Sequence, residues 1–215
     1  MSVNFDSNSI IDAAKRVVAN EAIAVAAAAD HIGESFVRVV RLLSACTGKA
    51  LVTGSGTSGA IAARAAHLLS VGGMPSFHLP PGDGLHGGLG ALRENDVIIA
   101  ISKGGNSAEL NEFCTRGRKL CAALVAVTAD ENSPLAKLAD HVLLVKSAPE
   151  ADLGTVIATG SSIAAGALLD ALVEACRITK GYEWESFFFT HPGGTVGKYA
   201  STTLDMLRKP GRDEK

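Results

Sequence analysis

A pattern of short apolar runs, glycine- and serine-rich loops and helical stretches begins at Lys49 and constrains the fold more than any other feature of the chain. Repeated strand–loop–helix units are typical of a parallel β-sheet with helices on both faces. Right-handed crossovers bring the loops that follow the strands to one edge of such a sheet, where ligands bind. We therefore predict an α/β three-layer sandwich with strands at 50–53, 75–79, 97–102, 122–128 and 141–145.

Helical periodicity accounts for most of the remaining chain. Helices are predicted at 58–71, 107–120, 134–138 and 159–178, and an alanine-rich helical segment at 7–46 has a break at 31–34. The alanine-rich face packs closely either on the chain's own core or on another subunit. We predict a single domain over 1–215, with N-terminal helices at 1–46, an α/β core at 47–200 and a tail at 201–215.

Composition excludes several classes of function. The formal net charge is −2 and the lysines and arginines are scattered, so a nucleic-acid partner is not expected. The four cysteines lack the spacing of a zinc site, and we predict neither a metal nor another cofactor. No basic start with an apolar run opens the chain, and its apolar windows are broken before membrane-spanning length. We expect a cytoplasmic protein without a membrane partner.

The first loop, 54–59, has the sequence Gly-Ser-Gly-Thr-Ser-Gly between a predicted strand and a predicted helix. Its glycines permit a tight backbone, while amide N–H groups and the hydroxyls of Ser55, Thr57 and Ser58 can converge on a phosphate. A purely structural turn is the plain alternative. A dinucleotide site is disfavoured, because no acidic residue ends the second predicted strand.

The second loop, 102–107, repeats the arrangement after the third predicted strand, with Ser102 and Ser107 as its hydroxyls. Neighbouring parallel strands would deliver both loops to one crevice, so the pair is a stronger signal than either loop alone. Lys103 could add a cation to this phosphate site, or it could be a solvated loop residue.

With these two loops the chain resembles the sugar isomerase (SIS) domain family. Three further segments are similar to its arabinose-5-phosphate isomerase subgroup: Leu-His-Gly-Gly-Leu-Gly at 85–90, Pro-Glu-Ala-Asp-Leu-Gly at 149–154 and Thr-His-Pro-Gly-Gly-Thr-Val-Gly at 190–197. The resemblance implies a flavodoxin-like or Rossmann-like fold of about five parallel strands. It also implies a homo-oligomer, a tetramer, whose subunits share active sites, and regulation through paired CBS modules is not expected in this chain.

The resemblance implies an aldose–ketose isomerase that acts through an enediolate on D-ribulose 5-phosphate and D-arabinose 5-phosphate or a close relative. Glu150 matches the subgroup's proposed base, Glu109 matches a second carboxylate, and His86 and His191 match its histidines. A carboxylate can move a proton between C1 and C2, and a histidine can open the ring or polarise the carbonyl. The two loops, through Ser55, Thr57, Ser58, Ser102, Lys103 and Ser107, would hold the phosphate, with Ser161 and Ser162 as weaker candidates.

Each assignment has an alternative. Glu109 could serve only the positive end of its helix, and Glu150 could be a solvated loop acid. Thr57 stands where the subgroup has a lysine, and Lys103 where it has an asparagine, so we hypothesise that the positive charge has moved between the loops. Two other functions therefore stay open: a sugar-phosphate sensor without turnover, and an isomerase of an amino-sugar or six-carbon phosphate.

Overall fold

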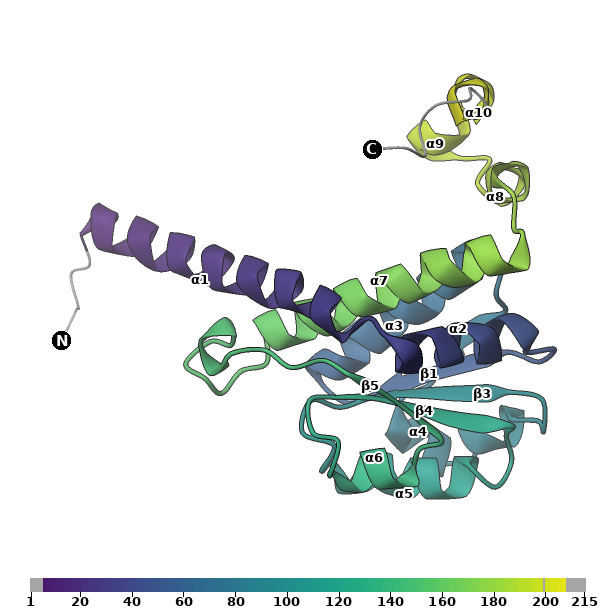
Figure 1. The fold of residues 1–215 in the computed structure, drawn as a ribbon, viewed down its shortest axis with the longest axis horizontal. Coiled ribbons are helices and arrows are strands. Elements are labelled where there is room, and N and C mark those ends of the chain that lie inside the picture. Colours follow the sequence, from purple (N-terminus) through teal and green to yellow (C-terminus); the bar gives the residue numbers. More distant parts are fainter. Residues whose placement is uncertain (1–5, 199, 208–215) are drawn as a thin grey trace.

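The computed structural model describes residues 6–198 and 200–207. Five parallel strands form a sheet in the order β2-β1-β3-β4-β5, with helices on both faces (Figure 1). The three-layer α/β fold is thus confirmed. The strand bounds are β1 Ala50–Gly54, β2 Ser76–His78, β3 Val97–Ile101, β4 Ala123–Thr128 and β5 His141–Leu144.

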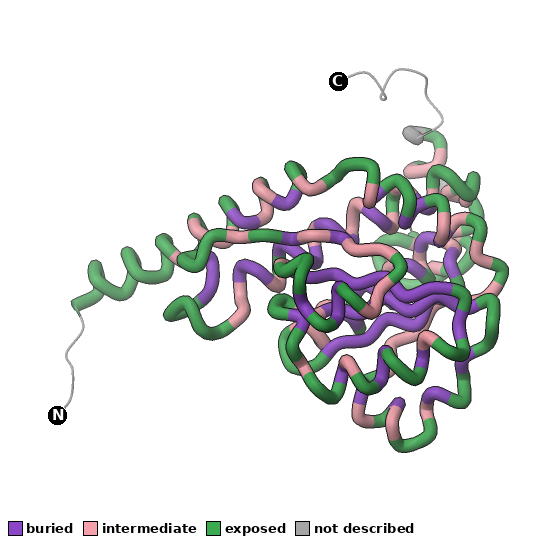
Figure 2. Tube along the Cα trace, turned by 60° about the horizontal axis from the view of Figure 1, so that its bottom comes forward, coloured by how far each residue is buried: buried purple, intermediate pink, exposed green. Residues whose placement is uncertain are grey.

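The three central strands β1, β3 and β4 are buried along their whole length, as Figure 2 shows. A strand covered on both faces must be apolar throughout, and this is why these segments stand out as continuous apolar runs. In the ladder, Gly54 at the end of β1 lies beside Ile101 at the end of β3. The loops that follow these two strands therefore leave the sheet next to each other.

Two hydrophobic clusters pack against the two faces of the sheet. One cluster unites apolar side chains of α1, α2, α3 and α7 with the sheet, and the other unites those of η2, α5 and α6 with it. The helices of the first face are α1 Ser7–Ala28, α2 Glu34–Ala45, α3 Thr57–Val71 and α7 Gly160–Lys180. On the second face lie α4 Pro81–Leu85, η2 Gly88–Ala91, α5 Ala108–Gly117 and α6 Pro134–Leu138.

Helix α1 packs on the body only near its C-terminal end, where Ala24 and Ala28 are its buried residues. Its N-terminal part projects away from the sheet (Figures 1 and 2). The short helix η1, Ala29–His31, and the residues before Glu34 separate α1 from α2, which confirms the predicted break. Neither α1 nor α7, nor any other described helix, has the length and apolar character needed to cross a membrane.

Three helices follow α7: α8 Trp184–Thr190, α9 Gly194–Lys198 and α10 Ala200–Leu207. They extend from the C-terminal end of α7, away from the sheet (Figure 1). The first part of the predicted tail at 201–215 is helical, because α10 extends to Leu207. The remainder of that tail, 208–215, lies outside the described residues.

Candidate functional site

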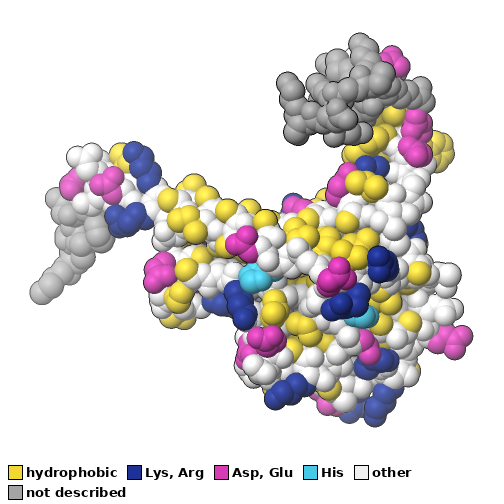
Figure 3. All heavy atoms as spheres, viewed as in Figure 1, with side chains coloured by type: hydrophobic (Ala, Val, Ile, Leu, Met, Phe, Trp, Pro, Cys, Tyr) yellow, Lys and Arg dark blue, Asp and Glu magenta, His cyan; other side chains and the backbone are white. Residues whose placement is uncertain are grey.

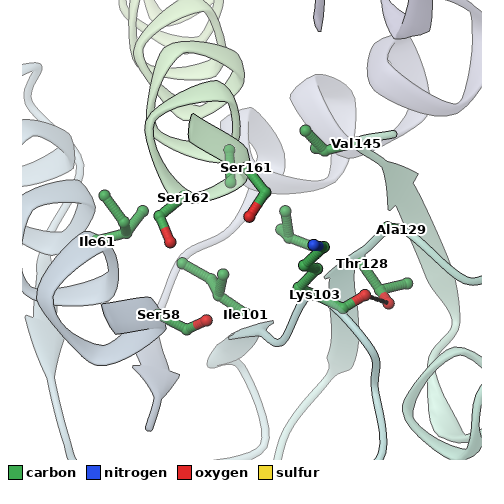
Figure 4. A pocket seen from close by; sticks show the side chains of 11 residues that line it. Ser58, Ile61, Ile101, Lys103, Thr128, Ala129, Val145, Ser161 and Ser162 are labelled. Carbon is green, nitrogen blue, oxygen red and sulfur yellow. Dashed lines mark hydrogen bonds between the residues drawn. The ribbon is translucent and has the colours of Figure 1, made fainter. Parts of the chain in front are cut away.

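A small cleft, partly open to solvent, lies at the carboxyl edge of the sheet. Its polar lining includes Ser58 from α3, Lys103 from the loop after β3, Thr128 at the end of β4, and Ser161 and Ser162 from the first turn of α7 (Figure 4). The remaining lining is aliphatic. The structure therefore brings the two predicted phosphate loops to one place, together with the start of a third element.

The first loop is a tight connection between β1 and α3. A Cβ atom at Gly54 would lie 3.0 Å from the carbonyl oxygen of Ile101 and 2.9 Å from the backbone of Ser58, so only glycine allows this close approach. The side chain of Ser58 lines the cleft, whereas Ser55 and Thr57 are exposed beside it. Of the three hydroxyls predicted here, Ser58 is the one directed into the cleft.

The second loop is held by its own hydroxyls. Ser102 Oγ accepts a hydrogen bond from Gly105 N at 3.2 Å, and Ser107 Oγ accepts one from Leu110 N at 3.4 Å and caps α5. Gly105 has φ +62°, and a Cβ there would overlap Ser133 Oγ. Each serine that accepts a bond keeps its own hydroxyl hydrogen for donation. Neither Ser102 nor Ser107 lines the cleft, so their part in phosphate binding stays a prediction.

Both the backbone carbonyl and the side-chain ammonium of Lys103 have partners within the protein. Its carbonyl oxygen accepts hydrogen bonds from Thr128 Oγ1 at 3.0 Å and from Ala129 N at 2.9 Å. Its Nζ lies 2.5 Å from Asp152 Oδ2. The lysine is therefore a cation of the cleft that is paired with a buried acid, and its direct role toward a phosphate stays a prediction.

Asp152 contacts two residues that line the cleft, Lys103 and Ser161, and no role was predicted for it from the sequence. Its carboxylate accepts from the backbone N–H groups of Thr159 and Ser161 through Oδ1 and from Ser161 Oγ through Oδ2. Burial raises the pKa of Asp152, but the hydrogen bonds from Lys103 and Ser161 lower it by a larger amount. The net pKa of Asp152 therefore lies below the usual range. Seven residues separate Asp152 from Thr159, the N-cap position of α7, so no local capping pattern marks it.

The two serines at the start of α7 already have partners. Ser161 Oγ donates to Asp152, and Ser162 Oγ donates to the carbonyl oxygen of Ala158 at 2.9 Å. Both hydroxyls retain acceptor capacity only, which suits a sugar hydroxyl better than a phosphate dianion. Their place in the cleft agrees with their weaker standing as phosphate ligands.

Glu150 lies in the short helix η3, Pro149–Ala151, and lines a groove of about 410 Å³ between η3 and α1. The backbone carbonyl of Glu150 accepts from Asn20 Nδ2 at 2.9 Å, and its side chain is exposed. The groove and the cleft share no lining residue, although Val145 of the cleft precedes Lys146 of the groove in the chain.

His86 and Glu109 lie on the opposite face of the sheet, beside α4. His86 follows the last residue of α4 and is exposed. Glu109 stands in the first turn of α5, and its Oε1 would be 3.3 Å from a Cβ at Gly82. Both residues thus lie next to the same short helix, but neither lines the cleft.

His191 follows α8 at the other end of the molecule. Its ring stacks on Phe187 with centroids 4.2 Å apart, and Nδ1 lies 3.0 Å from the carbonyl oxygen of Phe187. Nδ1 also lies 3.2 Å from Thr190 Oγ1, and in the tautomer with its proton on Nδ1 the ring donates to the Phe187 carbonyl. The 21-residue helix α7, about 30 Å long at 1.5 Å per residue, separates His191 from the cleft of the same chain.

No group of three or more histidine, cysteine, aspartate or glutamate side chains suited to a metal ion occurs within residues 6–198 and 200–207. Burial raises the pKa of the Cys114 thiol to about 12 and that of the Cys176 thiol to about 11. Both cysteines are buried core residues, and reactive thiolate chemistry is not their role.

Comparison with known proteins adds a family and several relatives. Residues 43–175 match the SIS domain. The arabinose 5-phosphate isomerase KdsD of Pseudomonas aeruginosa is 34% identical over 198 residues, which cover 92% of this chain and 60% of the relative. The chain spans about three fifths of the length of the curated relatives it matches.

Two solved structures are similar over most of this chain. A candidate sugar-phosphate isomerase from Listeria monocytogenes has a TM-score of 0.84 at 34% identity, and the match covers 88% of this chain and 100% of that one. The c3406 protein of Escherichia coli CFT073, solved in complex with arabinose 5-phosphate, has a TM-score of 0.83 at 29% identity, with 87% and 100% covered.

Proposed function

Because this chain belongs to the SIS domain family, we propose that it is an aldose–ketose isomerase that interconverts D-ribulose 5-phosphate and D-arabinose 5-phosphate or a close relative. One observation carries the proposal. Adjacent strands β1 and β3 end beside each other, and the segments that follow them bring the Ser58 hydroxyl and the Lys103 ammonium to one cleft. Hydroxyls, loop amides and a cation at the start of helices are the groups that bind a sugar phosphate.

The reaction needs an acid–base group as well as a phosphate site. In the aldose-to-ketose direction the proton leaves C2, the C1 carbonyl oxygen is protonated, and the resulting enediol returns a proton to C1 while C2 becomes the carbonyl. We assign the proton transfer between C2 and C1 to Glu150 and the oxygen proton transfers to His191 and His86. Glu109 would support His86 from the neighbouring helix.

We further propose that the active site forms between subunits. His191 lies one helix length from the cleft of its own chain, so it can serve only the cleft of another copy. Apolar side chains are exposed on both projecting parts: Ile10, Ile11 and Val18 on α1 and Phe189, 86% exposed, on α8. Figure 3 shows the hydrophobic side chains along α1. These surfaces support a homo-oligomer, which we propose to be a tetramer.

We place the protein in the cytoplasm. A phosphorylated sugar carries a charge that an apolar layer excludes, so a protein that acts on it belongs to the compartment where the sugar phosphate is made. Detection of the protein by fractionation of its native cells tests this placement.

The isomerase proposal is tested by incubating the purified protein with D-ribulose 5-phosphate and measuring the aldose formed. Loss of one acid–base group should lower kcat by about 10²–10⁴-fold in Glu150→Gln, with little change in folding because the side chain is exposed. Glu112→Gln is the matched control, since this exposed carboxylate pairs with Arg116 on α5. A Glu150→Gln variant as active as the parent would remove Glu150 from the mechanism.

The shared site is tested by mixing inactive subunits. Glu150→Gln and His191→Asn subunits that are expressed together should regain part of the parent activity, because some sites then combine an intact Glu150 with an intact His191. Light scattering measures the size of the same samples. A fully active monomer would contradict the shared site.

A sugar-phosphate sensor is the second candidate. The cleft combines a cation with hydroxyls, but none of the described residues that line it is a carboxylate or a histidine. Thermal stabilisation by a sugar phosphate without turnover of any ketose phosphate would favour this function over the isomerase.

A further inference from the structure

The cation of the cleft does not stand alone, because it is coupled to a buried acid. Lys103 comes from the loop after β3 and Asp152 from the segment before α7, and 49 residues separate them in the sequence. The Asp152 side chain is 1% exposed, whereas the Lys103 side chain is 41% exposed and lines the cleft. The pair therefore joins a buried anchor to a cation that a ligand can reach.

Asp152 is fully engaged within the protein. Four donors reach its two oxygens: the N–H groups of Thr159 and Ser161, the Ser161 hydroxyl and the Lys103 ammonium. The carboxylate thus ties the first turn of α7 to the second phosphate loop. A buried carboxylate with this many partners keeps one position, and so does the ammonium that it holds.

The ammonium retains donors for a ligand. A lysine ammonium carries three N–H donors, and the contact with Asp152 uses one of them. Figure 4 shows the Lys103 side chain between Thr128 and Ser161, with Ser58 on the other side of the cleft. The remaining donors are therefore available to an anion in the cleft.

We propose that Asp152 is a positioning residue that holds Lys103 over the phosphate of the bound sugar. The proposal rests on the proposed function, because it assigns the phosphate end of the substrate to this cleft. It explains how a flexible lysine, which otherwise loses rotamer entropy on binding, is ordered before the ligand arrives.

Asp152→Asn is the direct test, because its amide oxygen can still accept from Thr159 and Ser161 and so preserve the cap of α7. Its NH₂ group would then replace Oδ2 and face the Lys103 ammonium, and two donors repel each other. We expect the dissociation constant of arabinose 5-phosphate, measured by calorimetry, to rise about tenfold, the loss for one charge-assisted hydrogen bond.

A double-mutant cycle distinguishes positioning from a simple charge effect. In a Lys103→Met background, Asp152 is an unpaired anion beside the phosphate, so adding Asp152→Asn should tighten binding instead of weakening it. This reversal of sign is expected only if Asp152 acts through Lys103. Tighter binding by Asp152→Asn in the parent background, or equal binding, would overturn the proposal.

Two further measurements keep the test decisive. Asp96→Asn is the matched control, because Asp96 is also buried and also accepts from a lysine and from backbone amides at the other edge of the sheet. It should lower stability without changing the dissociation constant. If Asp152→Asn does not fold, unchanged binding of inorganic phosphate and of arabinose 5-phosphate by Lys103→Met would itself overturn the proposal.

The outcome is separable from that of the proposed function. Weaker binding by Asp152→Asn, with no turnover by the parent protein, would support the positioning role and contradict the isomerase. Turnover by the parent with the same KM in Asp152→Asn would support the isomerase and contradict the positioning role.

Discussion

Two lysine–aspartate pairs stand at opposite edges of the sheet and have almost the same local chemistry. In the first pair Lys49 precedes β1 and Asp96 precedes β3, and Lys49 Nζ lies 2.7 Å from Asp96 Oδ2. In the second pair Lys103 follows β3 and Asp152 lies in the segment before α7. The aspartate side chains are 2% and 1% exposed. Each accepts two backbone N–H hydrogen bonds in addition to its lysine.

The two lysines differ in what surrounds them. A Cβ at Gly48 would overlap Asp96 Oδ1, so the chain packs closely around this carboxylate. The Lys49 side chain is 33% exposed, and its ammonium lies 6.0 Å from the centroid of the Phe77 ring. Lys103 instead lines the cleft. The same pair stabilises the fold at one edge and, by our proposal, prepares a ligand site at the other.

The largest effect should come from breaking the amino-edge pair. In Asp96→Ala the backbone N–H groups of Lys49 and Arg93 lose their buried acceptor, which should lower the free energy of unfolding by about 3–5 kcal/mol. Urea denaturation measures the loss, and turnover per folded molecule should be unchanged. A change in KM of the folded fraction would show that the two edges are not independent.

The lysines offer a sharper contrast. Lys103→Met should raise the KM for the sugar phosphate by about 10- to 100-fold, because a charge-assisted hydrogen bond to the phosphate is lost. Lys49→Met should leave KM unchanged and lower stability instead. Steady-state kinetics of both variants test this, and equal KM values for the two would remove the functional difference between the edges.

Acid should weaken both pairs. Burial raises the pKa values of Asp96 and Asp152, but their hydrogen bonds lower them more, so both folded-state pKa values lie below the unfolded value of about 3.9. Each carboxylate thus contributes stability above a pH of about 3.9, and this contribution is lost as pH falls through the folded-state pKa. Urea denaturation from about pH 6 to about pH 2 should show a shallower decline in Asp96→Asn and in Asp152→Asn than in the parent.

The smallest effect is expected for an exposed pair. Arg116 and Glu112 form an i,i+4 contact on α5 with side chains 63% and 50% exposed. Arg116→Ala should change the free energy of unfolding by only about 0.3–0.5 kcal/mol, because solvent screens the pair. A loss as large as that of Asp96→Ala would mean that burial does not explain the strength of the two buried pairs.

The sheet and the position of the two loops follow from local sequence patterns. Parallel strands that are covered on both faces must be apolar along their length, and the predicted strands agree with the observed ones to within about two residues. The helix α6, Pro134–Leu138, has the predicted bounds because a proline and an N-cap serine mark its start. Glycine and hydroxyl residues after β1 and β3 were local signals of the same kind.

Local patterns do not predict which charged groups meet or which catalytic candidates lie far from the cleft; these depend on the folded chain. Lys103 and Asp152 form an ion pair although they lie 49 positions apart in the chain. No local sequence pattern at either position predicts its partner. His191 belongs to the 190–197 segment that resembles the subgroup, but it lies beyond the far end of α7. Apolar periodicity and turn chemistry are properties of neighbouring residues, whereas these placements depend on how the crossovers carry distant segments to one edge or to opposite ends.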